Sequence, residues 1–269
     1  MTIATMDDIA SGLSAAQQCW SVKNITIPKS IGGYQSSWMG TGTPGAGGAS
    51  PTYTTGSGYT CSSSTTGAIN YNNATTQNYL AKFAATSTIA GTLVLVDRLW
   101  SCSGMGYANS TYTVTTPGSL PARITDSGLG CQIWCEQFAA AGAATGTLTV
   151  SYVDPGSNTE SAVIPSTSLV SAPLIGQMQP VPLAAGYSTG VSQIASATNS
   201  ATWTSGTFGI TIVKPIAAIP ISAAGAANSM DWAACALAKV PANACLMFIW
   251  QGAAATANQV LTQLSFIDK

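Results

Sequence analysis

The chain has 269 residues, with 8 Lys or Arg, 9 Asp or Glu and no His. Charged residues make up 6% of the sequence, whereas an ordinary globular domain has about 25%. The scattered cations exclude the basic stripe of a nucleic-acid-binding protein, and the missing imidazole excludes Ser-His-Asp and Cys-His catalysis. We therefore expect a structural protein that needs no cofactor, not an enzyme.

Targeting and redox features predict a protein made in the cytoplasm. Residues 1–16 contain two aspartates and lack a basic region, so no secretory signal is expected. The most apolar stretch, residues 216–227, is short and contains Pro220 and Gly225, so no membrane span is expected. The seven cysteines show no CxxC spacing, and we expect buried free thiols rather than a metal site.

Residues 1–78 are predicted to form a short helix followed by an extended arm. Thr5 can cap a helix beginning at Met6, because its hydroxyl can accept from the first-turn amides and two aspartates follow at the positive end of the helix dipole. Residues 20–38 have an extended pattern, and residues 40–66 are rich in Gly, Ser, Thr and Pro, which is typical of a long surface segment. The helix is expected either to pack on the following domain or to dock on a neighbouring subunit.

Residues 79–269 have the pattern of β-structure, in which short apolar runs alternate with Gly, Pro, Asp and Asn turns. The expected strands are residues 79–85, 92–100, 112–116, 131–138, 147–153, 161–165, 191–197, 208–213, 245–251 and 260–268. Two Ala-rich pieces, residues 138–144 and 230–239, are expected to form helical turns. About ten short strands with irregular connections predict a mainly β fold, a β-sandwich of the jelly-roll type.

Asp97 and Arg98 form a charged dipeptide inside the apolar run 92–100. On a strand their side chains point to opposite faces, and burying either without a partner would cost several kcal/mol. The candidate partners are Glu136 for Arg98 and Arg123 for Asp97. Three roles fit this pattern: an intramolecular clamp between sheets, a salt bridge across a subunit interface, or a catalytic pair.

The seven tryptophans are spread along the chain, and most lie within expected strands. Their large apolar rings suit core or interface anchors, and Trp20, Trp38 and Trp100 are our interface candidates. The alternative is a sugar-stacking platform, for which Trp203 would be the residue to test.

A run in the middle of the chain resembles a known family. The run Gly91-Thr-Leu-Val-Leu-Val-Asp-Arg-Leu-Trp-Ser-Cys-Ser-Gly104 is similar to a segment of structural proteins of tailed bacteriophages. The motifs that follow in the same order are a Thr-rich strand at 111–116, Leu120-Pro-Ala-Arg123 and Gly130-Cys-Gln-Ile-Trp-Cys-Glu136. The resemblance covers residues 80–269, and the chain departs from it where Ser101 and Cys102 replace a histidine beside the tryptophan.

This resemblance implies a virion component, on the exterior of the phage head. We expect a capsid decoration (cement) protein that binds the major capsid protein or other virion subunits and stabilises the shell through many weak contacts. A homo-oligomer is expected, with a trimer as one arrangement. The alternatives are a tail or neck component and a carbohydrate-binding adhesin of the virion. Neither nucleic acid nor a membrane is expected as a partner.

Overall fold

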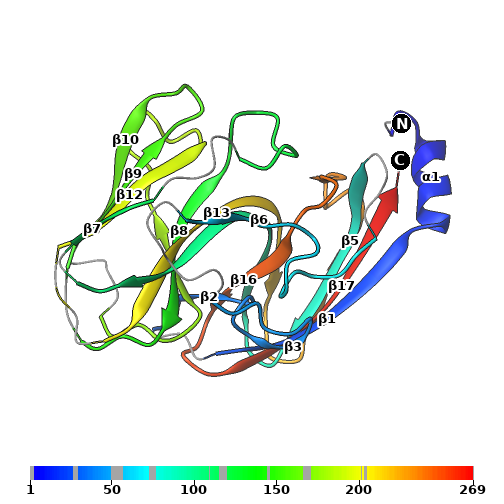
Figure 1. The fold of residues 1–269 in the computed structure, drawn as a ribbon. Helices are drawn as coiled ribbons and strands as arrows, with labels where there is room; N and C mark the ends of the chain where they lie inside the picture. The colour runs from blue at the N-terminus through cyan, green and yellow to red at the C-terminus, as the bar shows by residue number, and fades with distance from the viewer. Residues whose placement is uncertain are drawn as a thin grey trace.

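A computed structural model describes residues 3–26, 30–49, 57–72, 77–108, 110–114, 120–143, 146–165, 171–200, 202 and 205–268. These residues form 17 strands and one α-helix, so the mainly β class predicted from the sequence is confirmed (Figure 1). No helix in the described part of the chain has the length and apolar character needed to cross a membrane.

The strands form three sheets, which we name by their number of strands. The six-stranded sheet contains, in spatial order, β14 (Ala227–Met230), β5 (Asn78–Ser87), β17 (Asn258–Asp268), β1 (Gln17–Ile25) and β3 (Thr41–Thr43), with β15 (Lys239–Val240) paired to β5. The seven-stranded sheet contains β13 (Thr207–Ile221), β8 (Gln132–Ala139), β11 (Gln177–Val181), β2 (Tyr34–Ser36), β16 (Leu246–Gly252), β6 (Gly91–Gly106) and β4 (Tyr59–Thr60), and β13 also pairs with β6. The four-stranded sheet contains β10 (Thr159–Ile164), β9 (Leu148–Val153), β12 (Gln193–Asn199) and β7 (Ser110–Thr113).

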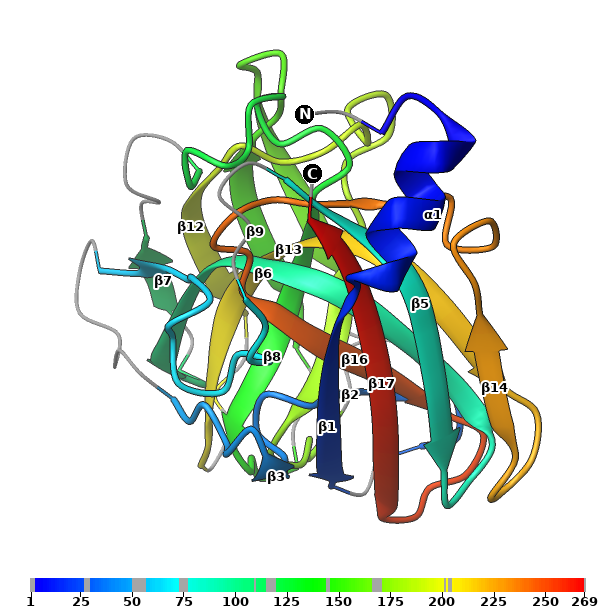
Figure 2. The ribbon, with the colours of Figure 1, turned by 90° about the vertical axis from the view of Figure 1, so that its right-hand side faces the viewer.

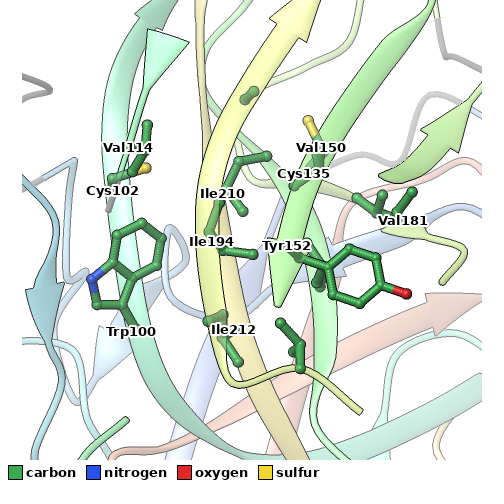
Figure 3. Close-up of a cluster of buried hydrophobic side chains, with 14 of the residues drawn as sticks. Trp100, Cys102, Val114, Cys135, Val150, Tyr152, Val181, Ile194, Ile210 and Ile212 are labelled. Atoms are coloured by element: carbon green, nitrogen blue, oxygen red, sulfur yellow. The ribbon is translucent and has the colours of Figure 1, made fainter. Parts of the chain in front are cut away.

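The long strands β6 and β13 join two sandwiches, because each strand reaches the cores against both other sheets (Figure 1). Near the start of β6, Leu93 and Leu95 pack with Phe83 of the six-stranded sheet. Further along, Trp100 packs in a second core with Val150 of the four-stranded sheet (Figure 3). The predicted β-sandwich is therefore confirmed, with a third sheet in addition to the usual two.

A β-bulge in β6 decides which side chains face the core. The register pairs Arg98 with Val213 and then shifts by one residue before Trp100, so Leu99 is the extra residue. The extra residue reverses the alternation of side chains along the strand. Arg98 consequently shares a face with Ser101, to which it is hydrogen-bonded, while Trp100 faces the core between the sheets.

One expected strand end and one expected helical turn are wrong. The strand predicted to end at Val213 continues to Ile221 through Pro215, because the register to β6 shifts just after this proline and the missing N–H is tolerated at such an irregularity. The helical turn predicted over residues 138–144 begins inside β8, which runs to Ala139, and residue 144 lies outside the described residues.

The other Ala-rich piece, residues 230–239, contains a single helical turn between the end of β14 and the start of β15. Asp231 caps it, since its side chain accepts from two backbone amides and its carbonyl accepts from the Cys235 amide at 2.8 Å. The turn cannot continue as a right-handed helix, because Ala236 and Leu237 have φ values of 51° and 46°.

The N-terminal helix forms where the sequence predicts it. α1 (Met6–Ser14) begins with a capping box, in which the Thr5 hydroxyl accepts from the Asp8 amide and the Asp8 carboxylate accepts from the Thr5 amide. Its buried residues are Ile9 and Gly12, which pack at the C-terminal end of β17 (Figure 2). The helix thus docks on the chain's own six-stranded sheet.

Several segments within residues 1–78 are strands of the six-stranded and seven-stranded sheets. β1 pairs with β17 along all nine of its residues and continues the sheet to β3. Trp38 and Ile69, which follow in the chain, are each 1% exposed and belong to buried cores. The inward face of β1 contains Ser21 and Lys23, so its sequence lacks the apolar alternation that would have predicted a central strand. A domain boundary at residue 78 stays a prediction.

Candidate functional site: a buried ion-pair network and an exposed sheet face

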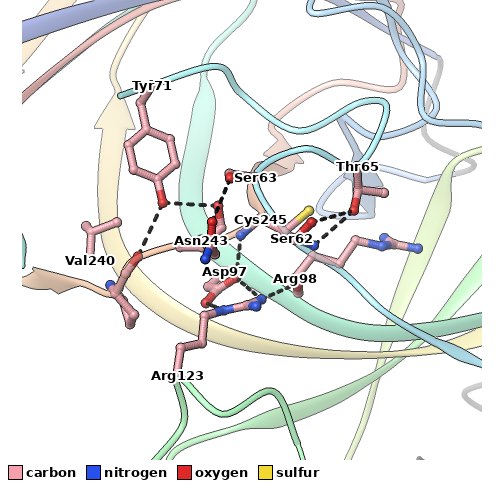
Figure 4. A network of polar contacts seen from close by, with 12 residues as sticks. Ser62, Ser63, Thr65, Tyr71, Asp97, Arg98, Arg123, Val240, Asn243 and Cys245 are labelled. Atoms are coloured by element: carbon pink, nitrogen blue, oxygen red, sulfur yellow. Dashed lines mark hydrogen bonds and ion pairs between the residues drawn. The ribbon is translucent and has the colours of Figure 1, made fainter. Parts of the chain in front are cut away.

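The Asp97 carboxylate holds three segments together. Arg123, in the loop before β8, donates from Nε to Oδ2 at 2.8 Å and from Nη2 to Oδ1 at 2.9 Å (Figure 4). The Cys245 amide at the start of β16 also donates to Oδ1 at 2.8 Å. This two-pronged pair fastens the loop and the beginning of β16 to β6.

Arg98 forms a second ion pair on the opposite face of β6. Its Nη1 lies 2.6 Å from Glu136 Oε2 on β8, and its Nη2 donates to Ser101 Oγ at 2.7 Å. Thr211 on β13, which separates the two strands, donates to the same Glu136 oxygen at 3.0 Å. The guanidinium also stacks 4.5 Å from the centre of the Trp38 ring.

Burial and pairing oppose each other in this network. Burial raises the pKa of the Asp97 carboxyl, and the hydrogen bonds and charge of Arg123 resist the rise. Burial lowers the pKa of the Arg98 guanidinium, but the charge and hydrogen bond of Glu136, together with Cys61 and Tyr59, outweigh burial and the pKa is raised. Arg98 Nε and Glu136 Oε1 have no hydrogen-bond partner among the described residues. Losing either member would therefore leave an uncompensated charge in the interior.

Both pairings expected from the sequence, Arg98 with Glu136 and Asp97 with Arg123, are present within one chain. The geometry is that of an intramolecular clamp, but it joins strands of one sheet and their flanking segments rather than two sheets. A role of these residues in a subunit interface stays a prediction.

Five charged residues line a cleft of about 480 Å³ beside this network, namely Asp97, Arg123, Asp126, Lys214 and Lys239. Lys214 Nζ lies 2.5 Å from Asp126 Oδ2, so both carboxylates of the cleft are neutralised by neighbouring cations. Lys239 has no ion-pair partner in the described part of the chain, which leaves the cleft with one net positive charge. Among the described residues, no group of three or more His, Cys, Asp or Glu side chains could hold a metal ion.

The outer face of the six-stranded sheet, turned away from the core, is the second notable surface (Figure 2). α1 covers one end of it, and the rest is open. Trp20 on β1 is 57% exposed and Leu261 on β17 is 38% exposed. A hollow of about 250 Å³ lies between them and is also lined by Lys82, Thr86 and Asn228. Lys82 is the one charged residue that the strands of the sheet place on this open part of the face.

Amide side chains on the outer face are held in fixed positions by one another. Gln263 donates to Gln18 at 2.8 Å and accepts from Lys82 at 3.1 Å. Gln259 donates to Asn24 at 3.0 Å in the same way across β17 and β1. The open part of this face therefore carries a single charge, and its amide side chains hydrogen-bond to one another.

The three tryptophans predicted as interface candidates lie in different environments. Trp38 stacks on Arg98 in a buried cluster, and Trp100 is buried in the core against the four-stranded sheet, each with 1% exposure. Only Trp20 of the three is exposed, and it is separated from the ion-pair network by the thickness of the sheet pair. Trp203 lies outside the described residues.

Sequence reasoning missed two buried groups. Lys23 is 1% exposed, and its ammonium donates to the carbonyls of Gly40 and Gly45 at 3.2 Å each; burial lowers its pKa to about 8. Cys61 and Cys245 lie beside Arg98 in one buried cluster. No spacing rule connects these residues, because folding alone brings them together.

No protein-family model and no curated protein matches the sequence. Among solved structures, the chain is similar to the VP2 subviral particle of infectious bursal disease virus, with a TM-score of 0.22, 8% identity, and coverage of 94% of this chain and 80% of that one. The structure of the Gt strain of this virus gives a TM-score of 0.18 and 9% identity, with coverage of 94% of this chain and 81% of that one. The Gx strain gives a TM-score of 0.20 and 8% identity, with coverage of 94% and 82%. TM-scores at this level do not establish a common fold.

Proposed function

We propose that this protein is a structural, non-enzymatic subunit of a virus particle, which packs on other virion subunits through the outer face of its six-stranded sheet. The observation that carries the proposal is the composition of this face, where exposed Trp20 and Leu261 flank a hollow with Lys82 as its one charge. Depletion of charge and an aromatic anchor beside a pocket are the features that distinguish interface cores from other surfaces.

The finer proposal is a decoration protein on the head exterior of a tailed phage. Its support is the resemblance of the run Gly91–Gly104 and the motifs after it to tailed-phage structural proteins. A decoration protein also needs a rigid body that presents one face to the shell. The ion-pair network supplies rigidity here, since Asp97 and Arg98 connect β6 to β8, to β16 and to the loop that contains Arg123.

The mechanism of such a protein is passive. Docking of the outer face would remove the exposed parts of Trp20 and Leu261, 57% and 38% of the side chains, from water. Full burial of a large apolar side chain contributes about 1.5–3 kcal/mol, so these partly exposed side chains would contribute roughly half of that each. The amides are already positioned by mutual hydrogen bonds, so docking orders few side chains. Binding to the assembled shell alone stabilises the shell by mass action.

The test measures binding to particles that lack this protein. The purified chain is added to such particles, and the bound fraction is determined by co-sedimentation. Trp20→Ala is expected to weaken binding by at least about tenfold, as for an interface anchor. Tyr187→Ala is the matched control, because Tyr187 is 41% exposed but lies in the segment that leads into the four-stranded sheet. Equal binding by the two variants would refute the docking face.

Two further measurements separate the alternatives. Quantitative mass spectrometry of intact virions distinguishes a decoration protein, present in hundreds of copies, from a tail or neck component, present in a few. A glycan array distinguishes the adhesin, for which Trp20→Ala would abolish sugar binding while particle binding stays unchanged.

A further inference from the structure

Two buried cysteines from distant parts of the sequence, Cys61 and Cys245, have their side chains in contact. Ser63 and Asn243 are joined by a backbone hydrogen bond of 3.2 Å, and their side chains by a second bond of 3.5 Å. Cys61 lies two residues before Ser63 and Cys245 lies two residues after Asn243, and the two thiols are hydrogen-bonded to each other. Thiols in hydrogen-bond contact are a small shift from disulfide geometry, in which the Cβ atoms are about 3.5–4.5 Å apart.

The backbone contacts with β6 place the same two residues side by side. The Cys61 amide donates to the Leu99 carbonyl at 3.0 Å, and the Arg98 amide donates to the Cys245 carbonyl at 2.8 Å. β4 and β16 both pair with β6, and their ends meet at this point of its edge. Both thiols are fully buried in the cluster that surrounds Arg98, and Figure 4 shows Cys245 next to the segment that begins with Ser62.

We propose that Cys61 and Cys245 are a redox-active pair that forms a disulfide when the protein meets a disulfide oxidant such as oxidised glutathione. The Cys61 thiolate attacks one sulfur of the oxidant, and the oxidant's S–S bond breaks to release one glutathione thiolate. Cys245 then loses its proton to solvent and attacks the Cys61 sulfur, which releases the second glutathione. Two protein thiols are oxidised and one glutathione disulfide is reduced to two thiols.

The local electrostatics favour Cys61 as the thiolate that attacks first and Cys245 as the thiol that reacts second. Burial alone would raise the pKa of Cys61, but its hydrogen bond with Cys245 and the charge of Arg98 lower it below the usual value. The same hydrogen bond, together with burial, raises the pKa of Cys245. β4, which covers the pair, contains only two paired residues, so access requires a small local opening.

The experiment uses the full chain, unfolded and then refolded in buffers of graded oxidised-to-reduced glutathione ratio, so that burial cannot protect the thiols. After alkylation, peptide mass spectrometry should find Cys61 joined to Cys245 and the other five cysteines free. The midpoint of thermal unfolding should rise by roughly 5–15 °C and return on reduction, because the bond closes a long loop.

Cys102→Ser is the matched control, since Cys102 is equally buried but packs on the opposite side of β6, in the core with the four-stranded sheet. It should keep the cross-link, whereas Cys61→Ser and Cys245→Ser should leave all six remaining thiols free. Circular dichroism confirms that each variant folds. The proposal is overturned if the refolded parent keeps seven free thiols at every ratio, or if another pair or only glutathione adducts form.

Discussion

Replacing Glu136 by Gln should destabilise the protein by about 3–5 kcal/mol, the usual effect of breaking a buried ion pair. The guanidinium of Arg98 is 1% exposed, and Glu136 is its one carboxylate partner in the described structure. Gln has nearly the same shape and can still accept from Thr211, so the loss is electrostatic rather than a cavity. Stacking on Trp38 compensates in part, by about 2 kcal/mol at most.

Urea and thermal unfolding, followed by tryptophan fluorescence and circular dichroism, measure this loss. A loss of 3 kcal/mol corresponds to a fall in Tm of roughly 6–12 °C for a chain of this size. The double variant Arg98→Met, Glu136→Leu should recover most of the stability, because it removes both buried charges together.

The comparison variant is Asp126→Asn, whose partner Lys214 is 30% exposed, and it should cost less than about 1 kcal/mol. The reasoning would be refuted if Glu136→Gln cost no more than Asp126→Asn. It would also be refuted if the double variant were less stable than Glu136→Gln alone, since the two charges would then not be coupled.

Three other perturbations probe separate parts of the fold. The free energy of unfolding should fall by about 3 kcal/mol between pH 7 and pH 10. Burial raises the pKa of four thiols from 9.0 to about 12 in the folded chain, whereas the unfolded thiols ionise near 9; these are Cys19, Cys102, Cys131 and Cys135. Burial lowers the pKa of Lys23 to about 8, so this lysine opposes the loss of stability above pH 8, but it is one group against four. A melting temperature constant up to pH 10 would contradict it. Gly12→Ala should make α1 more sensitive to limited proteolysis despite the better helix propensity of Ala, since its Cβ would clash with Ile267 Cγ2. Deleting residues 1–26 should abolish cooperative unfolding in calorimetry, because β1 is an interior strand of the six-stranded sheet; a normal transition would show that the sheet closes without it.

Local patterns predicted the elements whose signals are local. The capping residues of α1 and the alternation of Leu148, Val150 and Tyr152 in β9 depend on neighbours in the chain, and both elements form as expected. The ion pairs were predictable for a different reason. A charge inside an apolar run must find a partner, and a chain with 17 charges offers few candidates.

The features that were missed depend on tertiary pairing. β1 is an interior strand although Ser21 and Lys23 point inward, because the Lys23 ammonium reaches the carbonyls of Gly40 and Gly45, which no pattern along β1 reveals. β13 continues past Pro215 because a register shift relative to β6 removes the need for that N–H. Trp20 is exposed because of which face of β1 turns inward. Polar and apolar residues occur on both faces of β1, so the sequence of the strand does not indicate the inward face.

The distribution of charge connects the composition of the chain to the proposed docking. Seven of the 17 charged residues belong to the ion-pair network or its cleft: Asp97, Arg98, Arg123, Asp126, Glu136, Lys214 and Lys239. Because these residues lie in or beside the ion-pair network, few charged side chains remain on the rest of the surface to repel neighbouring protein molecules. The open part of the outer face has Lys82 alone, and that ammonium is already hydrogen-bonded to Gln263. Docking this face would therefore desolvate almost no free charge, which is the condition under which burial of Trp20 and Leu261 can dominate the binding energy.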